Sequence, residues 1–295
     1  GRGVGKAAEI KGGHFRLAAW REGGALLGVC VAAVAPTALA AWTGTPFSLF
    51  AFGFAGLALI AVVLMLPEWS APQVHVPTGF RAILEDRYTR RLLALALVNA
   101  APLAISSTLF LFFVESRLDA AGWEGPLLVL FFLAAAISAP VWSRLAQRSS
   151  DRSVLFAAMI LAILSFGCAL LLGAGDAPAF AIICIVSGAT IGADLTLLPA
   201  MFARRMSVVS PNGGQGFGLW SLVNKFTLAF AAVVLLPILD SAGFKTGAEA
   251  LPESALWTLT ALYAGLPCLL KLLSIGMLWL LPSNPDDPFT DRSSI

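Results

Sequence analysis

The chain has 295 residues, of which 58% are hydrophobic and 12% are charged, and its mean hydropathy is +0.85. Because soluble domains carry about 25% charged residues, this composition excludes a soluble globular protein and predicts a polytopic membrane protein. The net charge of +2, without a basic patch that interleaves aromatic residues, excludes nucleic acid as a partner.

Residues that bind metals and cofactors are sparse. The four cysteines lie inside apolar runs without CxxC spacing, and both histidines, His14 and His75, lie in polar segments. This pattern predicts no metal site and no cofactor. A membrane enzyme needs clustered histidine, cysteine or carboxylate groups near one face, so we expect that the protein is not an enzyme.

Apolar runs of about 20 residues, the length that crosses a bilayer as a helix, recur along the whole chain. They cover residues 17–41, 47–66, 92–114, 126–146, 153–173, 178–203, 216–239 and 256–281. We therefore predict an all-α fold, a membrane-embedded bundle of about eight transmembrane helices.

Lysine and arginine alternate between rich and poor connecting segments. The rich segments are residues 2–16 and 67–91, the loop with Arg144, Arg148 and Arg152, and the loop with Arg204 and Arg205; the loops between them hold at most one such residue. Basic loops stay on the cytoplasmic side, so we expect a multi-pass plasma membrane protein with both termini in the cytoplasm.

The longest loop, residues 67–91, leaves two spans before it and six after it. Its second half places Phe80, Ile83, Leu84 and Tyr88 at helical spacing. This pattern fits an amphipathic helix on the membrane surface. A plain polar linker that becomes helical at the next span is the alternative.

Two opposite charges lie deep in neighbouring spans. Nine residues separate Asp194 from the pair Arg204 and Arg205, and Lys225 follows Gly216 by nine residues, so both lie roughly 13 Å from the same membrane face. A charge at this depth usually faces a partner or a water-filled cavity. We expect the two residues to form or border a polar site inside the bundle; the alternative is a structural ion pair that only locks two helices.

Four segments carry a family resemblance. HFRLAAWREGGALLGVCVAAVAP resembles the fifth helix, and NAAPLAISSTLFLFFV the seventh helix, of the glycoside-pentoside-hexuronide:cation symporters, the melibiose-carrier-like family of the major facilitator superfamily. GADLTLLPAMFARR and GFGLWSLVNKFTLAFA resemble its tenth and eleventh helices. The resemblance implies a twelve-helix plan in two halves, of which this chain covers the fifth to the twelfth helix.

On that plan the chain divides into four parts. Residues 1–66 hold the last two helices of the N-terminal half, 67–91 the central cytoplasmic loop, 92–281 the six-helix C-terminal half, and 282–295 a cytoplasmic tail. The resemblance implies secondary active symport of a sugar, glycoside or similar polar organic solute, coupled to Na⁺ or H⁺, by a monomer that contacts membrane lipid and its solute. Because four helices are absent, the alternative is a truncated, transport-incompetent relative that serves as a membrane scaffold or remnant.

The resemblance also implies site residues. Lys225 matches an eleventh-helix lysine near the sugar and cation sites, and Trp220 and Ser221 lie one turn earlier. Arg21 matches a fifth-helix arginine that helps to bind sugar, although it lies close enough to the span's end to reach the interface and pair there with Glu22. Trp220 is as compatible with the core as with the site.

Three more positions complete the expected set. Asp194 matches an aspartate found in part of the family, and Asn99 on the seventh helix either binds solute or bonds to a neighbouring helix. We expect Lys271 to pack or to reach the interface, because the plan puts its helix outside the bundle. ARRMSVV stands where many relatives carry an acidic ADVVDY-like stretch, which puts the gating contacts of those acids in doubt.

Overall fold

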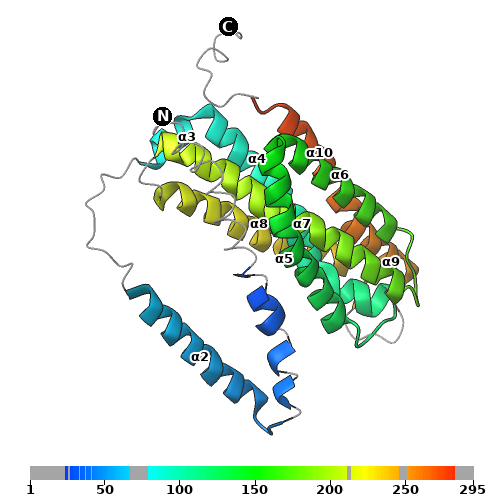
Figure 1. The fold of residues 1–295 in the computed structure, drawn as a ribbon. Helices are drawn as coiled ribbons and strands as arrows, with labels where there is room; N and C mark the ends of the chain where they lie inside the picture. Colours follow the sequence, from blue (N-terminus) through cyan, green and yellow to red (C-terminus); the bar gives the residue numbers. More distant parts are fainter. Residues whose placement is uncertain are drawn as a thin grey trace.

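A computed structural model describes residues 24–25, 27–32, 34–36, 38–40, 42–66, 79–210, 214–245 and 251–282. Every regular element in these ranges is a helix, as Figure 1 shows. Seven of these helices are long and apolar enough to cross a membrane. The predicted all-α membrane bundle is therefore confirmed.

The helices follow the predicted runs closely. They are α2 (Pro46–Met65), α3 (Phe80–Glu85), α4 (Arg87–Phe112), η2 (Phe113–Arg117), α5 (Glu124–Arg148), α6 (Asp151–Ala169), α7 (Ala177–Val209), α8 (Gly214–Ser241), α9 (Glu253–Thr260), η3 (Ala261–Gly265) and α10 (Leu266–Trp279). The π-helical turns η2 and η3 continue α4 and join α9 to α10 into single spans. The first predicted span, 17–41, is described only in part, where an apolar helix covers Leu27–Ala40.

Helices α4 to α10 pack into one bundle with α7 at its centre. Helix α7 contacts α5 along most of its length and also contacts α6 and α4, while α10 lies against α4 and α6, and α8 lies against α4. Helix α2 stands apart (Figure 1), and none of its side chains is buried. The described helices thus enclose a core to which α7 contributes the most buried residues.

Two glycines let α7 approach α5 closely. A Cβ at Gly188 would collide with the carbonyl of Phe131, and one at Gly192 would lie 2.6 Å from the carbonyl oxygen of Ala135. Small residues four apart allow helix backbones to meet in this way inside membranes. The Ser138 hydroxyl, at 2.9 Å, and the Trp142 indole N–H, at 2.7 Å, then donate to the carbonyl oxygen of Ala189 between them.

The two π-helical turns meet in an aromatic cluster. The ring of Phe113 on η2 stacks on Tyr263 of η3 with centroids 4.3 Å apart, and Phe180 of α7 packs against both. A π-turn widens a helix locally and shifts its side chains relative to the rest of the span. Here the two turns place their aromatic residues face to face in the core.

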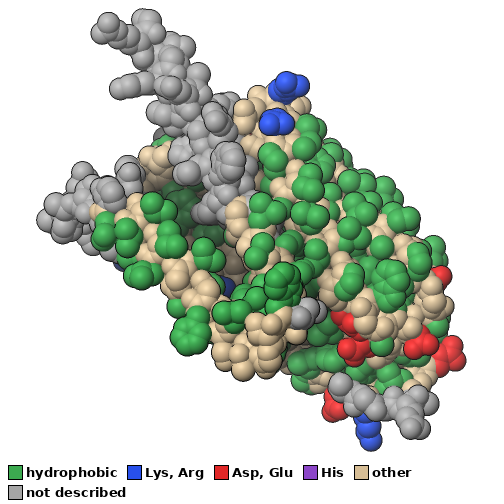
Figure 2. Space-filling model, turned by 60° about the horizontal axis from the view of Figure 1, so that its bottom comes forward, with side chains coloured by type: hydrophobic (Ala, Val, Ile, Leu, Met, Phe, Trp, Pro, Cys, Tyr) green, Lys and Arg blue, Asp and Glu red, His purple; other side chains and the backbone are tan. Residues whose placement is uncertain are grey.

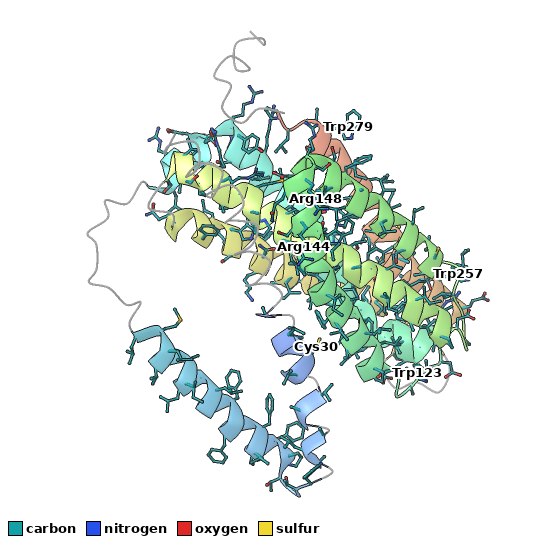
Figure 3. All side chains as sticks on the ribbon, viewed as in Figure 1. Cys30, Trp123, Arg144, Arg148, Trp257 and Trp279 are labelled. Atoms are coloured by element: carbon teal, nitrogen blue, oxygen red, sulfur yellow. The ribbon has the colours of Figure 1, made fainter. Side chains whose placement is uncertain are left out.

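The surface of the bundle suits a bilayer. Figure 2 shows hydrophobic side chains over most of the visible face, with acidic side chains gathered at one end. In Figure 3, Trp123 and Trp257 lie at one end of the bundle and Trp279 at the other, and all three are exposed. Tryptophan favours the two interfaces of a membrane, so these rings mark both edges of the apolar band.

The amphipathic segment forms a shorter helix than its sequence pattern suggests. Ile83 of α3 is fully buried, while Phe80 and Leu84 are exposed. Asp86 has an extended backbone that ends α3, and its carboxylate accepts a hydrogen bond from the Thr89 backbone N–H as the N-cap of α4. Tyr88 therefore belongs to the next span rather than to α3.

Candidate functional site

Three polar side chains from three helices meet in the middle of the bundle. The Lys271 ammonium on α10 donates to Asp194 Oδ2 on α7 at 2.5 Å and to Asn99 Oδ1 on α4 at 2.7 Å. The side chain of Lys271 is 2% exposed, and that of Asp194 is 13% exposed. We call these three residues the central polar cluster.

A proline lies close to each member of the cluster on its own helix. Pro102 follows Asn99, Pro199 follows Asp194, and Pro267 precedes Lys271 by three to five residues in each case. A proline inside a helix removes one backbone hydrogen bond and favours a bend. The three helices are thus interrupted at the level where they carry their polar groups.

The cluster is balanced in charge but incomplete in hydrogen bonding. Asp194 Oδ1 is buried and accepts no hydrogen bond from any described residue. A buried ion pair repays the cost of desolvation only when its remaining donors and acceptors are satisfied. The Asp194–Lys271 pair therefore contributes little to the stability of the fold. It leaves one carboxylate oxygen, Oδ1, in the membrane interior without a hydrogen-bond donor among the described residues.

The expectation that Asp194 pairs with Lys225 is wrong, because Asp194 pairs with Lys271 instead. Lys225 lies on an exposed face of α8 and makes no hydrogen bond or ion pair with another described residue. Depth along the helix axis matched Asp194 to Lys225, but depth does not fix the direction in which a side chain points. The expectation that Lys271 packs at the periphery or reaches the interface is also wrong, because its ammonium points inward.

The remaining expected site residues do not join the cluster, with one exception. Asn99 binds Lys271 and so bonds to a neighbouring helix. Trp220 is partly buried against the Phe202 ring, with centroids 5.0 Å apart, and Ser221 is exposed. Arg21 lies outside the described residues.

Sequence reasoning underrated Lys271, although a signal was present. Lys271 lies eight residues before Trp279, the end of its helix, which puts it roughly 12 Å from that end. Lys271 and Lys225 therefore lie at about the same depth as Asp194. The sequence alone therefore indicates three charged residues at the same depth in the membrane: Asp194, Lys225 and Lys271.

The sequence matches the family of the "MFS/sugar transport protein" description over residues 6–284. That match spans nearly the whole chain. The chain belongs to the major facilitator superfamily. A comparison with curated proteins gives no match.

Membership in the major facilitator superfamily indicates a multi-pass membrane transporter. Proteins of this kind place polar groups inside the membrane where a solute or an ion crosses, because a buried ionisable group is too costly to keep otherwise. The central polar cluster and Lys225 are the two such features within the described spans.

A second set of ion pairs holds one end of this major facilitator bundle together. Arg204 and Arg205, at the end of α7, pair with Asp151 at the start of α6 and with Asp86 at the start of α4. The Arg205–Asp86 distance is 2.5 Å. We call these four residues the arginine-end pairs.

These contacts lower the pKa of the Asp86 carboxyl group. Burial alone would raise its pKa, but hydrogen bonds from Arg205 and Thr89 outweigh burial, so its pKa lies below the ordinary value. Aspartates at the starts of α6 and α4 thus supply the charges opposite to those of the two arginines.

Arg152 and Arg91 extend this end to α10. Arg152 donates to the carbonyl oxygens of Trp279 and Leu281, at 2.5 and 3.0 Å, and Arg91 donates to that of Leu280 at 3.1 Å. Cations stabilise the carbonyl end of a helix in this way. Arg152 therefore caps a helix, whereas Arg144 and Arg148 are exposed on α5 (Figure 3).

Proposed function

We propose that this chain is part of a cation-coupled symporter that carries a sugar, a glycoside or a similar polar organic solute. The observation that carries the proposal is the match to the MFS/sugar transport family over residues 6–284. The resemblance of its helices to the glycoside-pentoside-hexuronide:cation symporters supports the narrower assignment and the coupling to Na⁺ or H⁺. The match does not favour a transport-incompetent remnant.

The proposed mechanism is a rocking of two helical halves about a site near the middle of the membrane. Lys225 faces outward from α8 and is free to donate hydrogen bonds to hydroxyl or acidic groups of the solute. Arg21, Trp220 and Ser221 complete the proposed solute contacts. We further propose a monomer in the plasma membrane with both termini in the cytoplasm.

The test is uptake by the full-length protein that contains this chain, reconstituted in lipid vesicles. A panel of labelled sugars and glycosides is offered with and without an inward gradient of Na⁺ or of protons. We expect at least one solute to accumulate only when a cation gradient is present. Failure of every polar solute to accumulate under either gradient would refute the proposal.

The role of Lys225 is tested by comparing uptake by two variants, Lys225→Gln and Lys245→Gln. Lys225→Gln should abolish gradient-driven uptake. The substitution replaces the ammonium group by a neutral amide near mid-membrane, where the attraction between the ammonium and the polar groups of the solute is strong. Lys245→Gln makes the same chemical change at an exposed residue beyond α8 and should leave uptake unchanged. Equal uptake by the two variants would remove Lys225 from the solute site.

A further inference from the structure

Two arginines on the outward face of α5 have no partner among the described residues. Arg144 and Arg148 lie one helical turn apart at the end of α5, and both are exposed (Figure 3). Neither makes a hydrogen bond or an ion pair with a described residue. Because a guanidinium stays protonated in proteins, this end of α5 presents two fixed positive charges.

The carboxylates at this end of the bundle are already engaged. The acidic residues that the structure describes here are Glu85, Asp86 and Asp151, and each forms an ion pair with another arginine. None of them is left to neutralise Arg144 or Arg148. The counter-charge for these two arginines must therefore come from outside the described helices.

An apolar stripe continues the line of the two arginines along the same face of α5. Leu133, Ile137 and Val141 are exposed and lie four residues apart, and Arg144 and Arg148 extend this line to the helix end. Arg144 follows Leu133 by eleven residues, about 16 Å along the helix axis. One leaflet of a hydrocarbon core about 30 Å thick has nearly the same depth. We call Leu133, Ile137 and Val141 the apolar stripe of α5.

The side chains of the apolar stripe suit lipid better than another helix. Helices in membranes approach each other closely through small residues. The side of α5 that packs on α7 carries residues of this kind, Ala135, Ser138 and Ala139. The outward side carries large branched side chains instead, and Ile137 is 63% exposed. An apolar face one leaflet deep that ends in two arginines matches an acyl chain below a negatively charged headgroup.

We propose that Arg144 and Arg148 bind the phosphate of an anionic phospholipid whose acyl chain lies along the apolar stripe of α5. The planar guanidinium donates two parallel hydrogen bonds to phosphate oxygens, and one turn of helix, about 6 Å, brings both guanidinium groups to one headgroup. Each basic residue strengthens attraction to an anionic lipid surface about fivefold. A zwitterionic lipid has the same phosphate, but its own ammonium offsets the charge.

Native mass spectrometry of the full-length protein that contains this chain measures lipid binding directly. The protein is mixed with known amounts of phosphatidylglycerol or phosphatidylcholine, and the dissociation constant of the first bound lipid is determined for each. We expect phosphatidylglycerol to bind the wild type more tightly than phosphatidylcholine, by about 25-fold if the two arginines act independently. The α5 double variant, Arg144→Gln/Arg148→Gln, should lose this preference.

A control variant removes the same charge at the same end of the bundle. Arg81→Gln/Arg90→Gln changes two arginines that already bond to Glu85 and to the backbone carbonyl of Leu84, so the preference for phosphatidylglycerol should remain. A wild-type preference in the α5 double variant would overturn the proposal and would mean that another part of the full-length protein covers the two arginines. An equal loss in the control would also overturn it, because the attraction would then follow the total surface charge.

A competition experiment separates a lipid from a free anion. Inorganic phosphate shares the chemistry of the headgroup but has no acyl chain to lie on the apolar stripe. Excess inorganic phosphate, with ionic strength held constant by chloride, should therefore leave phosphatidylglycerol bound to the wild type. Its displacement would overturn the assignment to a lipid.

The melting temperature in lipid nanodiscs gives a second reading. Both side chains are exposed without a described partner, so the α5 double variant should melt like the wild type in phosphatidylcholine alone. Phosphatidylglycerol in the nanodisc should raise the melting temperature of the wild type more than that of the variant, because a ligand that binds the folded state stabilises it. An equal rise in both proteins would contradict the proposal.

Discussion

Removing the Lys271 ammonium alone should destabilise the bundle strongly. Lys271→Met keeps most of the side chain's volume but leaves the Asp194 carboxylate in the interior with no described cation beside it. Breaking one side of a buried ion pair costs about 3–5 kcal/mol, because the remaining charge stays desolvated without compensation. We expect a loss of this size in the free energy of unfolding of the full-length protein at neutral pH.

The double variant Asp194→Asn/Lys271→Met gives the contrast. Replacement of a whole buried pair by neutral groups is often neutral or stabilising, so this variant should be more stable than Lys271→Met although it carries one more substitution.

Unfolding of the purified protein in detergent, followed by tryptophan fluorescence, measures both variants against the wild type. A cost for Lys271→Met below about 0.5 kcal/mol, the range of ordinary surface changes, would refute the reasoning. So would a double variant that is less stable than the single variant. Either result would mean that Lys271 is hydrated or mobile rather than locked to Asp194.

Three further predictions concern other parts of the bundle. Gly188→Ala should cost about 1–3 kcal/mol in unfolding free energy by crowding the Phe131 carbonyl, whereas Gly167→Ala, which meets open space, should be neutral or stabilising by less than about 1 kcal/mol. Asp86 has a lowered pKa, so its contribution to stability is present above the ordinary carboxyl range and is lost as pH falls below about 4; Asp86→Asn should narrow that acid-induced loss in a pH series of melting temperatures. Trp142→Phe removes the indole donor to the Ala189 carbonyl and should lower unfolding free energy by about 1 kcal/mol, with the exposed Trp123→Phe as the unchanged control.

The spans were predictable because hydrophobic length is a strong and local signal. Seven of the eight expected runs appear as helices whose ends differ from the predicted ends by a few residues, and α4 and α7 are extended at their arginine-rich ends. A span needs about 20 apolar residues whatever it packs against, so no knowledge of neighbours is required. The break at Asp86 depends on a side-chain cap and was not foreseen.

The pairing of Asp194 was not predictable, because it depends on rotation about the helix axis. Helices in a membrane are apolar on most faces, so the sequence pattern carries little information on which face points inward. Lys225 and Lys271 were equally deep, and only the assembled bundle distinguishes the outward lysine from the inward one. The π-helical turns at Phe113 and Tyr263 likewise arise from packing.

The paired charges tie four helices of the bundle to one another. Asp194 with Lys271, Arg204 with Asp151, and Arg205 with Asp86 tie α4, α6, α7 and α10 to one another at two levels. Helices joined in this way would move as a unit in the rocking mechanism proposed above.

Lys225 is the exception within the middle of the described spans, since its charge is satisfied by no described neighbour. An unpaired cation near mid-membrane is costly, so it must meet its counterpart outside these helices. That counterpart belongs to whatever enters or faces the exposed side of α8. The described helices thus contain an internal ion pair that joins α7 to α10 and an outward cation on α8, and separate substitutions at Lys271 and Lys225 distinguish the two.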